Sequence, residues 1–72
     1  MNQEVGLRVN GEYREFVGGI PATLANLIDS LHLDSGKLVA EVNGELVKRD
    51  DFASRALSNG DQIELVRFVG GG

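Results

Sequence analysis

The sequence contains no cysteine and no tryptophan, and only one proline among its 72 residues. Without cysteine the chain can form no disulfide, offers no thiolate nucleophile and supplies no thiolate ligands for zinc. A hydrophobic core alone must therefore stabilise the fold. A chain this short buries only about 60% of the surface that its unfolded form exposes. We expect one small domain without a deep catalytic cavity.

Long hydrophobic runs are also missing, since none approaches the roughly 18 to 20 residues of a membrane span. The start, Met1-Asn2-Gln3-Glu4, lacks the basic and apolar blocks of a signal peptide. We therefore expect a cytoplasmic protein with no membrane partner. Eleven acidic residues outnumber seven scattered basic ones, which argues against a nucleic-acid partner. The acidic surface keeps a small protein soluble, the interpretation we favour, and would also suit partners with basic docking faces.

Apolar residues alternate with other residues over 4–9, which predicts a half-buried strand. The strand runs into Asn10-Gly11, a dipeptide typical of tight hairpin turns, and a return strand follows. The register is open at this stage. A two-residue loop sets Phe16 opposite Val5, whereas a three-residue loop with a bulge sets Val17 there.

One helix is predicted over residues 23–32. Its apolar stripe follows the i, i+3, i+4, i+7 spacing and consists of Leu24, Leu27, Ile28 and Leu31. Thr23 is suited to cap the first turn. The only histidine, His32, lies at the predicted end of this helix and has no sequence signature of a catalytic partner, so we interpret it as structural.

The second half predicts another hairpin over residues 38–48, with its turn at Asn43-Gly44. Residues 49–58 show no clean period and predict an irregular or short helical turn anchored by Phe52 and Leu57. Residues 62–68 predict the last strand, with Val66 and Phe68 on the face opposite Ile63 and Leu65.

This order predicts an α+β domain of the β-grasp type over residues 1–68. We expect a mixed sheet of about four to five strands packed by one main helix, with the first and last strands parallel and adjacent at the centre. Residues 69–72 form a flexible C-terminal tail in this interpretation. The exposed face of the last strand, Val66 and Phe68 with Val69 and Leu46, is our hypothesis for a partner-binding patch.

Catalytic and metal-binding side chains are scarce. Asp50-Asp51 beside Lys48-Arg49 is best interpreted as a solvated, salt-bridged turn, and we expect no metal site. The chain instead ends in Gly70, Gly71 and Gly72. This ending is either an ordinary frayed terminus or a thin arm that carries a reactive α-carboxylate into a partner. Residues 69–72 reach roughly 13 Å when extended. A carboxylate is a poor electrophile, so acyl transfer would require activation by that partner.

Three stretches carry a resemblance that covers essentially the whole chain. They are Val42-Asn43-Gly44-Glu45-Leu46-Val47, Asn59-Gly60-Asp61-Gln62-Ile63-Glu64-Leu65-Val66 and the ending Val69-Gly70-Gly71-Gly72. Together with the β-grasp order they resemble the ThiS family of sulfur carriers. The second stretch and the ending are shared with small subunits of molybdopterin synthase, while the short length and the Val-Gly-Gly-Gly ending favour the thiamine branch. Lys48 stands where many relatives have proline.

The resemblance implies a protein co-substrate and not an enzyme. A ThiF-type adenylyltransferase would use ATP and magnesium to adenylate the Gly72 carboxylate, and this chain itself would bind no cofactor. Sulfur from a cysteine desulfurase persulfide would give a Gly72 thiocarboxylate, which the thiazole synthase ThiG would consume. Gly70 and Gly71 would let the tail thread into these enzymes. We expect a monomer when the chain is free.

Two alternatives stay open. One is a carrier of the molybdopterin-synthase type or another sulfur-delivery route. The other is a ubiquitin-like modifier or a passive interaction module, whose Gly72 would form an isopeptide bond or stay an acid. The fate of Gly72 separates these functions.

Overall fold

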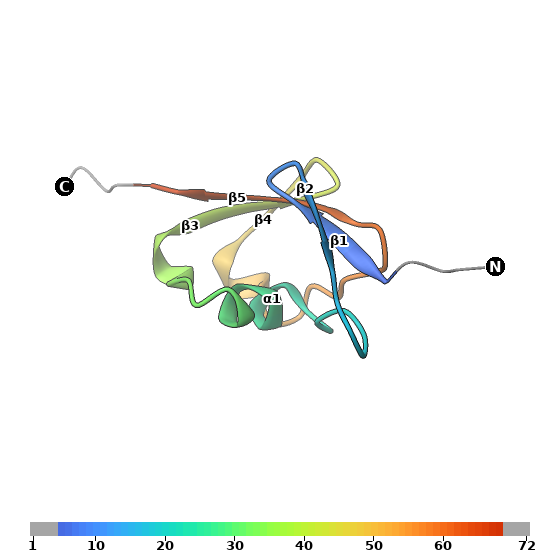
Figure 1. The fold of residues 1–72 in the computed structure, drawn as a ribbon. Coiled ribbons are helices and arrows are strands. Elements are labelled where there is room, and N and C mark those ends of the chain that lie inside the picture. Colours follow the sequence, from blue (N-terminus) through green and yellow to red (C-terminus); the bar gives the residue numbers. More distant parts are fainter. Residues whose placement is uncertain (1–4, 69–72) are drawn as a thin grey trace.

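A computed structural model describes residues 5–68. Within them, five strands form one mixed sheet and a single α-helix, α1, packs across one side of it (Figure 1). The strands are β1 Gly6–Val9, β2 Glu12–Glu15, β3 Leu38–Val42, β4 Glu45–Val47 and β5 Gln62–Arg67. They lie in the order β2-β1-β5-β3-β4, with β5 parallel to β1 and antiparallel to β3. The predicted β-grasp architecture is confirmed.

The first hairpin uses the two-residue turn. Asn10 and Gly11 have φ angles of 52° and 84°, which is the left-handed pair that a type I′ turn requires. Gly6 lies opposite Glu15 in the register, and the N–H of Phe16 donates to the carbonyl of Val5 at 2.9 Å. Of the two predicted registers, the one that sets Phe16 opposite Val5 is therefore correct.

Gly6 of β1 occupies a position that no other residue could fill without a shift. A Cβ placed there would lie 2.4 Å from the Tyr13 hydroxyl oxygen and 2.5 Å from the carbonyl oxygen of Arg14. Tyr13 thus lies across the Gly6 backbone from the neighbouring strand, and glycine allows this close approach. The aromatic ring covers the backbone that glycine leaves bare.

The helix α1 spans Leu24–Ser30, shorter than the predicted 23–32. Thr23 caps it as predicted, since its side chain accepts from the N–H of Asn26 at 3.2 Å. The helix ends early because His32 adopts a left-handed φ of 59°, which breaks the helical path. A 3₁₀ turn, η1 over Ser35–Lys37, follows and leads into β3.

The segment predicted to be irregular supports the start of α1. It contains a 3₁₀ turn, η2 over Arg49–Asp51, and its anchors Phe52 and Leu57 are buried as predicted. The N–H groups of Leu24 and Ala25 have no partner inside the helix and donate to the carbonyls of Arg55 and Phe52, both at 2.9 Å. Tertiary contacts therefore complete the first turn of this short helix.

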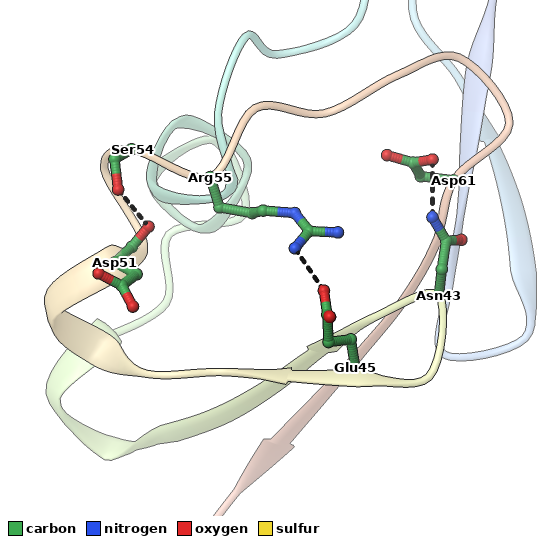
Figure 2. Close-up of polar contacts among 6 residues, drawn as sticks. All are labelled: Asn43, Glu45, Asp51, Ser54, Arg55 and Asp61. Atoms are coloured by element: carbon green, nitrogen blue, oxygen red, sulfur yellow. Dashed lines mark hydrogen bonds and ion pairs between the residues drawn. The ribbon is translucent and has the colours of Figure 1, made fainter.

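Polar contacts join the second hairpin to this segment and to the start of β5 (Figure 2). The Asn43 amide donates to Asp61 at 3.0 Å, while the Asn43 side-chain oxygen accepts from the N–H of Gln62 at 2.9 Å. Arg55 forms an ion pair with Glu45 at 2.8 Å. These contacts set where β5 begins beside β3.

The core fills the space between α1 and the inner face of the sheet. Its buried members are Leu7, Val9, Leu24, Leu27, Ile28, Leu38, Ala40, Val42, Val47, Phe52, Leu57, Ile63 and Leu65. The described part of the chain contains no helix long and apolar enough to cross a membrane. The candidate functional residues considered next are not members of this core.

Candidate functional site

Four large apolar side chains of β3, β4 and the end of β5 are exposed on the outer face of the sheet, away from α1, and we call them the outer-sheet patch. Their exposed fractions are 64% for Leu46, 56% for Val66, 44% for Phe68 and 41% for Val39. Side chains of neighbouring strands on one face of a sheet lie side by side. An exposed apolar group of this kind is typical of an interaction surface.

The strand register brings the outer-sheet patch together. Val39 of β3 lies directly opposite Val66 of β5. The N–H of Phe68 donates to the carbonyl of Lys37 at 3.1 Å, so the antiparallel ladder continues past β5 and keeps Phe68 on the side of Val66. Leu46 of β4 is opposite Glu41, one diagonal step from Val39.

The structure brings together three of the residues that the sequence predicted for partner binding, Leu46, Val66 and Phe68. The fourth, Val69, lies outside the described residues, as do Gly70, Gly71 and Gly72. Val39 was not among the predicted residues. Its alternation with Leu38, Ala40 and Val42 indicates the outer face, but only the strand register shows that it lies opposite Val66.

Two carboxylates lie on the same outer face. Glu41 and Glu64 are directly opposite each other in the β3–β5 register, and both are exposed. No ion pair within residues 5–68 involves either of them. Opposed like charges destabilise a sheet, so this pair is not explained by the stability of the domain. The outer face is thus apolar with a local negative charge, which complements an apolar and basic partner surface.

The described residues offer no set of side chains for catalysis or metal binding. No group of three or more potential metal ligands occurs among them. His32 is exposed after the end of α1, and Asp50 and Asp51 are exposed in η2. A hollow of about 270 Å³ between α1 and η2 has walls of mixed polarity, with Asp29, Ser35 and Arg49 among its lining residues. Nothing there pairs a nucleophile with a base.

Comparison with known families and structures gives a consistent result. The profile of the ThiS family matches residues 7–72. The crystal structure of the thiamine biosynthesis protein ThiS from Geobacter metallireducens superimposes with a TM-score of 0.82 at 29% identity, covering 94% of this chain and all of that one. An NMR structure of a thiamine biosynthesis protein from the same organism gives a TM-score of 0.77 at 29% identity, with 94% and 88% of the two chains covered.

Sequence relatives are of two kinds. A thiazole synthase from Paramagnetospirillum magneticum is 39% identical over 66 residues, which are 92% of this chain and 20% of that protein. The chain therefore spans only about a fifth of the length of the thiazole synthases that it matches. An uncharacterized protein, ycf40, from Porphyra purpurea is 29% identical over 72 residues and covers nearly its full length, 99%.

Proposed function

Because this chain belongs to the ThiS family, we propose that it is a sulfur carrier of thiamine biosynthesis and that the Gly72 carboxyl group carries the sulfur. The observation that carries the proposal is the family match over residues 7–72. In this function the chain is a co-substrate and its chemistry is supplied by partner enzymes.

The reaction requires activation, since a carboxylate is a poor electrophile. A ThiF-type adenylyltransferase with ATP and magnesium would let a Gly72 carboxylate oxygen attack the α-phosphorus, releasing pyrophosphate and forming an acyl adenylate. The terminal sulfur of a persulfide, supplied by a cysteine desulfurase, would then attack the acyl carbon and release AMP. A further thiol would cleave the resulting S–S bond and become oxidised to a disulfide, which leaves the thiocarboxylate on Gly72.

The outer-sheet patch suits docking of such an enzyme. Four residues, 69–72, follow Phe68 and reach at most about 13 Å. An active site that reaches Gly72 must therefore approach the end of β5 where Val66 and Phe68 are exposed. Gly70 and Gly71 add no side chain to the tail, which permits a narrow channel.

Thiazole synthase is the proposed consumer of the sulfur. Support comes from the relatives of that name, which contain a segment similar to nearly all of this chain. Within one such chain, a carrier segment would lie close to the enzyme that consumes its sulfur. We further propose that the chain acts in the cytoplasm, as a monomer when free.

The decisive experiment is intact-mass spectrometry after incubation with a ThiF-type enzyme, magnesium-ATP, cysteine desulfurase and cysteine. Replacement of oxygen by sulfur should map to Gly72 by fragmentation and should require ATP. Fragmentation is needed because oxidation of Met1 adds nearly the same mass. If Gly72 stays an acid with an enzyme of verified activity, or appears in an isopeptide bond to lysine, the sulfur-carrier function is wrong.

A matched pair of tail variants tests the role of the glycines. Gly71→Ala or deletion of Gly72 should abolish adenylate formation while thermal unfolding stays nearly unchanged, because neither change alters a residue of the buried core. Pyrophosphate release reports activation and circular dichroism reports stability. Gly36→Ala controls for loss of a glycine elsewhere, because Gly36 has no left-handed φ and an added Cβ would meet only the Asp34 carboxylate oxygen at 3.3 Å. A deletion variant that still forms adenylate would refute the assignment.

A further inference from the structure

The central strand β5 extends beyond its neighbour β1. The two strands pair only at Arg8 with Gln62 and at Val9 with Ile63. Asn10 adds the last contacts, since its N–H donates to the Ile63 carbonyl at 2.9 Å and its side-chain oxygen accepts from the N–H of Leu65 at 2.7 Å. The chain then turns away at Gly11.

Backbone groups of β5 alternate between its two neighbours. The carbonyl of Gln62 accepts from Asn43 at 2.7 Å and the N–H of Phe68 donates to Lys37 at 3.1 Å, so the even-numbered residues bond on the β3 side. The carbonyl of Leu65 and both backbone groups of Arg67 consequently point to the side where β1 has ended. Within residues 5–68 no hydrogen bond takes up these three groups. Figure 1 shows β5 continuing past β1 toward the C-terminal end.

We propose that this open edge of β5, from the Leu65 carbonyl to Arg67, receives an extended segment of the activating enzyme as an added strand. The inference rests on the proposed function, because the occupant is the enzyme that acts on Gly72. Unpaired main-chain groups at a sheet edge are the feature that strand addition uses.

The length of the tail argues for this occupant. Four residues lead from Phe68 to Gly72, so the enzyme that reaches Gly72 has to come within about 13 Å of Phe68, which directly follows the open edge. Main-chain pairing fixes which residue of the added strand lies opposite which residue of β5. It would therefore set how far the tail enters the active site. The added strand would present apolar side chains to Val66 and Phe68, which are exposed on the outer face at this edge.

Hydrogen exchange of single amides tests the pairing directly. The ¹⁵N-labelled chain is measured by NMR alone and in complex with a ThiF-type enzyme without ATP, with binding verified by calorimetry. We expect exchange of the Arg67 amide to slow by at least about tenfold in the complex. The Glu15 amide, which points away from β1 at the free edge of β2, is the matched control and should keep its rate.

A proline substitution gives a second, independent readout. Arg67→Pro removes the N–H that points to the open edge and leaves the β3 ladder, in which this N–H takes no part, intact. We expect Arg67→Pro to weaken binding by at least about tenfold more than Arg67→Ala, which keeps the N–H. Glu15→Pro should bind like the unmodified chain. Amide exchange decides the matter if Arg67→Pro fails to fold.

The outcomes separate the two proposals. Binding with an Arg67 amide that still exchanges fast would overturn strand addition and leave the carrier function standing. Lack of binding together with an unmodified Gly72 in the mass experiment would overturn both.

Discussion

Replacement of Phe68 by alanine tests the docking surface. Phe68 contributes to both partner binding and domain stability, so the two effects are measured separately. The domain leaves 44% of this residue exposed. A phenylalanine side chain buries about 200 Å² when fully covered, so a partner that covers the exposed share removes about 90 Å² from water. At about 25 cal/mol per Å² this is about 2 kcal/mol. Allowing for the Cβ that alanine keeps, we expect Kd for the ThiF-type enzyme to rise by about 10- to 30-fold.

The covered share of Phe68 sets the expected cost to the fold. Truncating a side chain that is little more than half buried should lower the free energy of unfolding by about 1–2 kcal/mol, below the cost at a full core site. The melting temperature should fall by about 4–16 °C, with a cooperative transition retained. Isothermal titration calorimetry measures the first effect and thermal circular dichroism the second.

Val17 supplies the control for this experiment. It is fully exposed, at 101%, and follows β2 at the far edge of the sheet. Val17→Ala should change neither binding nor stability. An unchanged Kd for Phe68→Ala would refute docking at the outer-sheet patch, and loss of the cooperative transition would make Phe68 a core residue.

Three further changes test the fold and the outer face. Gly6→Ala should lower the free energy of unfolding by about 1–3 kcal/mol in urea titrations, and adding Tyr13→Ala should restore only part of it, since a backbone oxygen also blocks the Cβ. Equal stability of Gly6→Ala and the unmodified chain would contradict the close approach. Asp61→Ala removes the acceptor of two hydrogen bonds and should cost about 1–3 kcal/mol, whereas a cost near zero would show that the contact does not stabilise the fold. Glu64→Gln relieves repulsion from Glu41 and should raise stability by about 0.2–1 kcal/mol, less at high salt. A loss of stability would mean that the charge is favourable.

Local signals in the sequence predicted most elements. The Asn10-Gly11 turn, the Thr23 cap and the anchors Phe52 and Leu57 are all confirmed. The end of α1 was predicted too far along the chain because the left-handed backbone of His32 has no local sequence signal comparable to glycine. The first-hairpin register stayed open because Phe16 and Val17 are both apolar, and only the pairing decides which one faces Val5.

Contacts between distant strands were beyond local patterns. Val39 joins the outer-sheet patch because β3 pairs with β5 in a register that sets it opposite Val66. The same register opposes Glu41 and Glu64, and neither strand alone contains that information. The open edge of β5 exists because its parallel neighbour β1 ends before β5 does. The relative positions of these two strand ends cannot be predicted from either segment alone, since the segments lie far apart in sequence.

The place of β5 in the sheet also bears on how the protein is made. β5 joins two hairpins, β1–β2 and β3–β4, that do not pair with each other, and it follows both of them along the chain. A nascent chain therefore holds two separate hairpins until β5 leaves the ribosome, and an isolated hairpin is at best marginally stable in water. Translation products that stop before β5 would stay unfolded and open to proteolysis. Folding would thus act as a check that synthesis has reached the strand immediately before the terminal glycines.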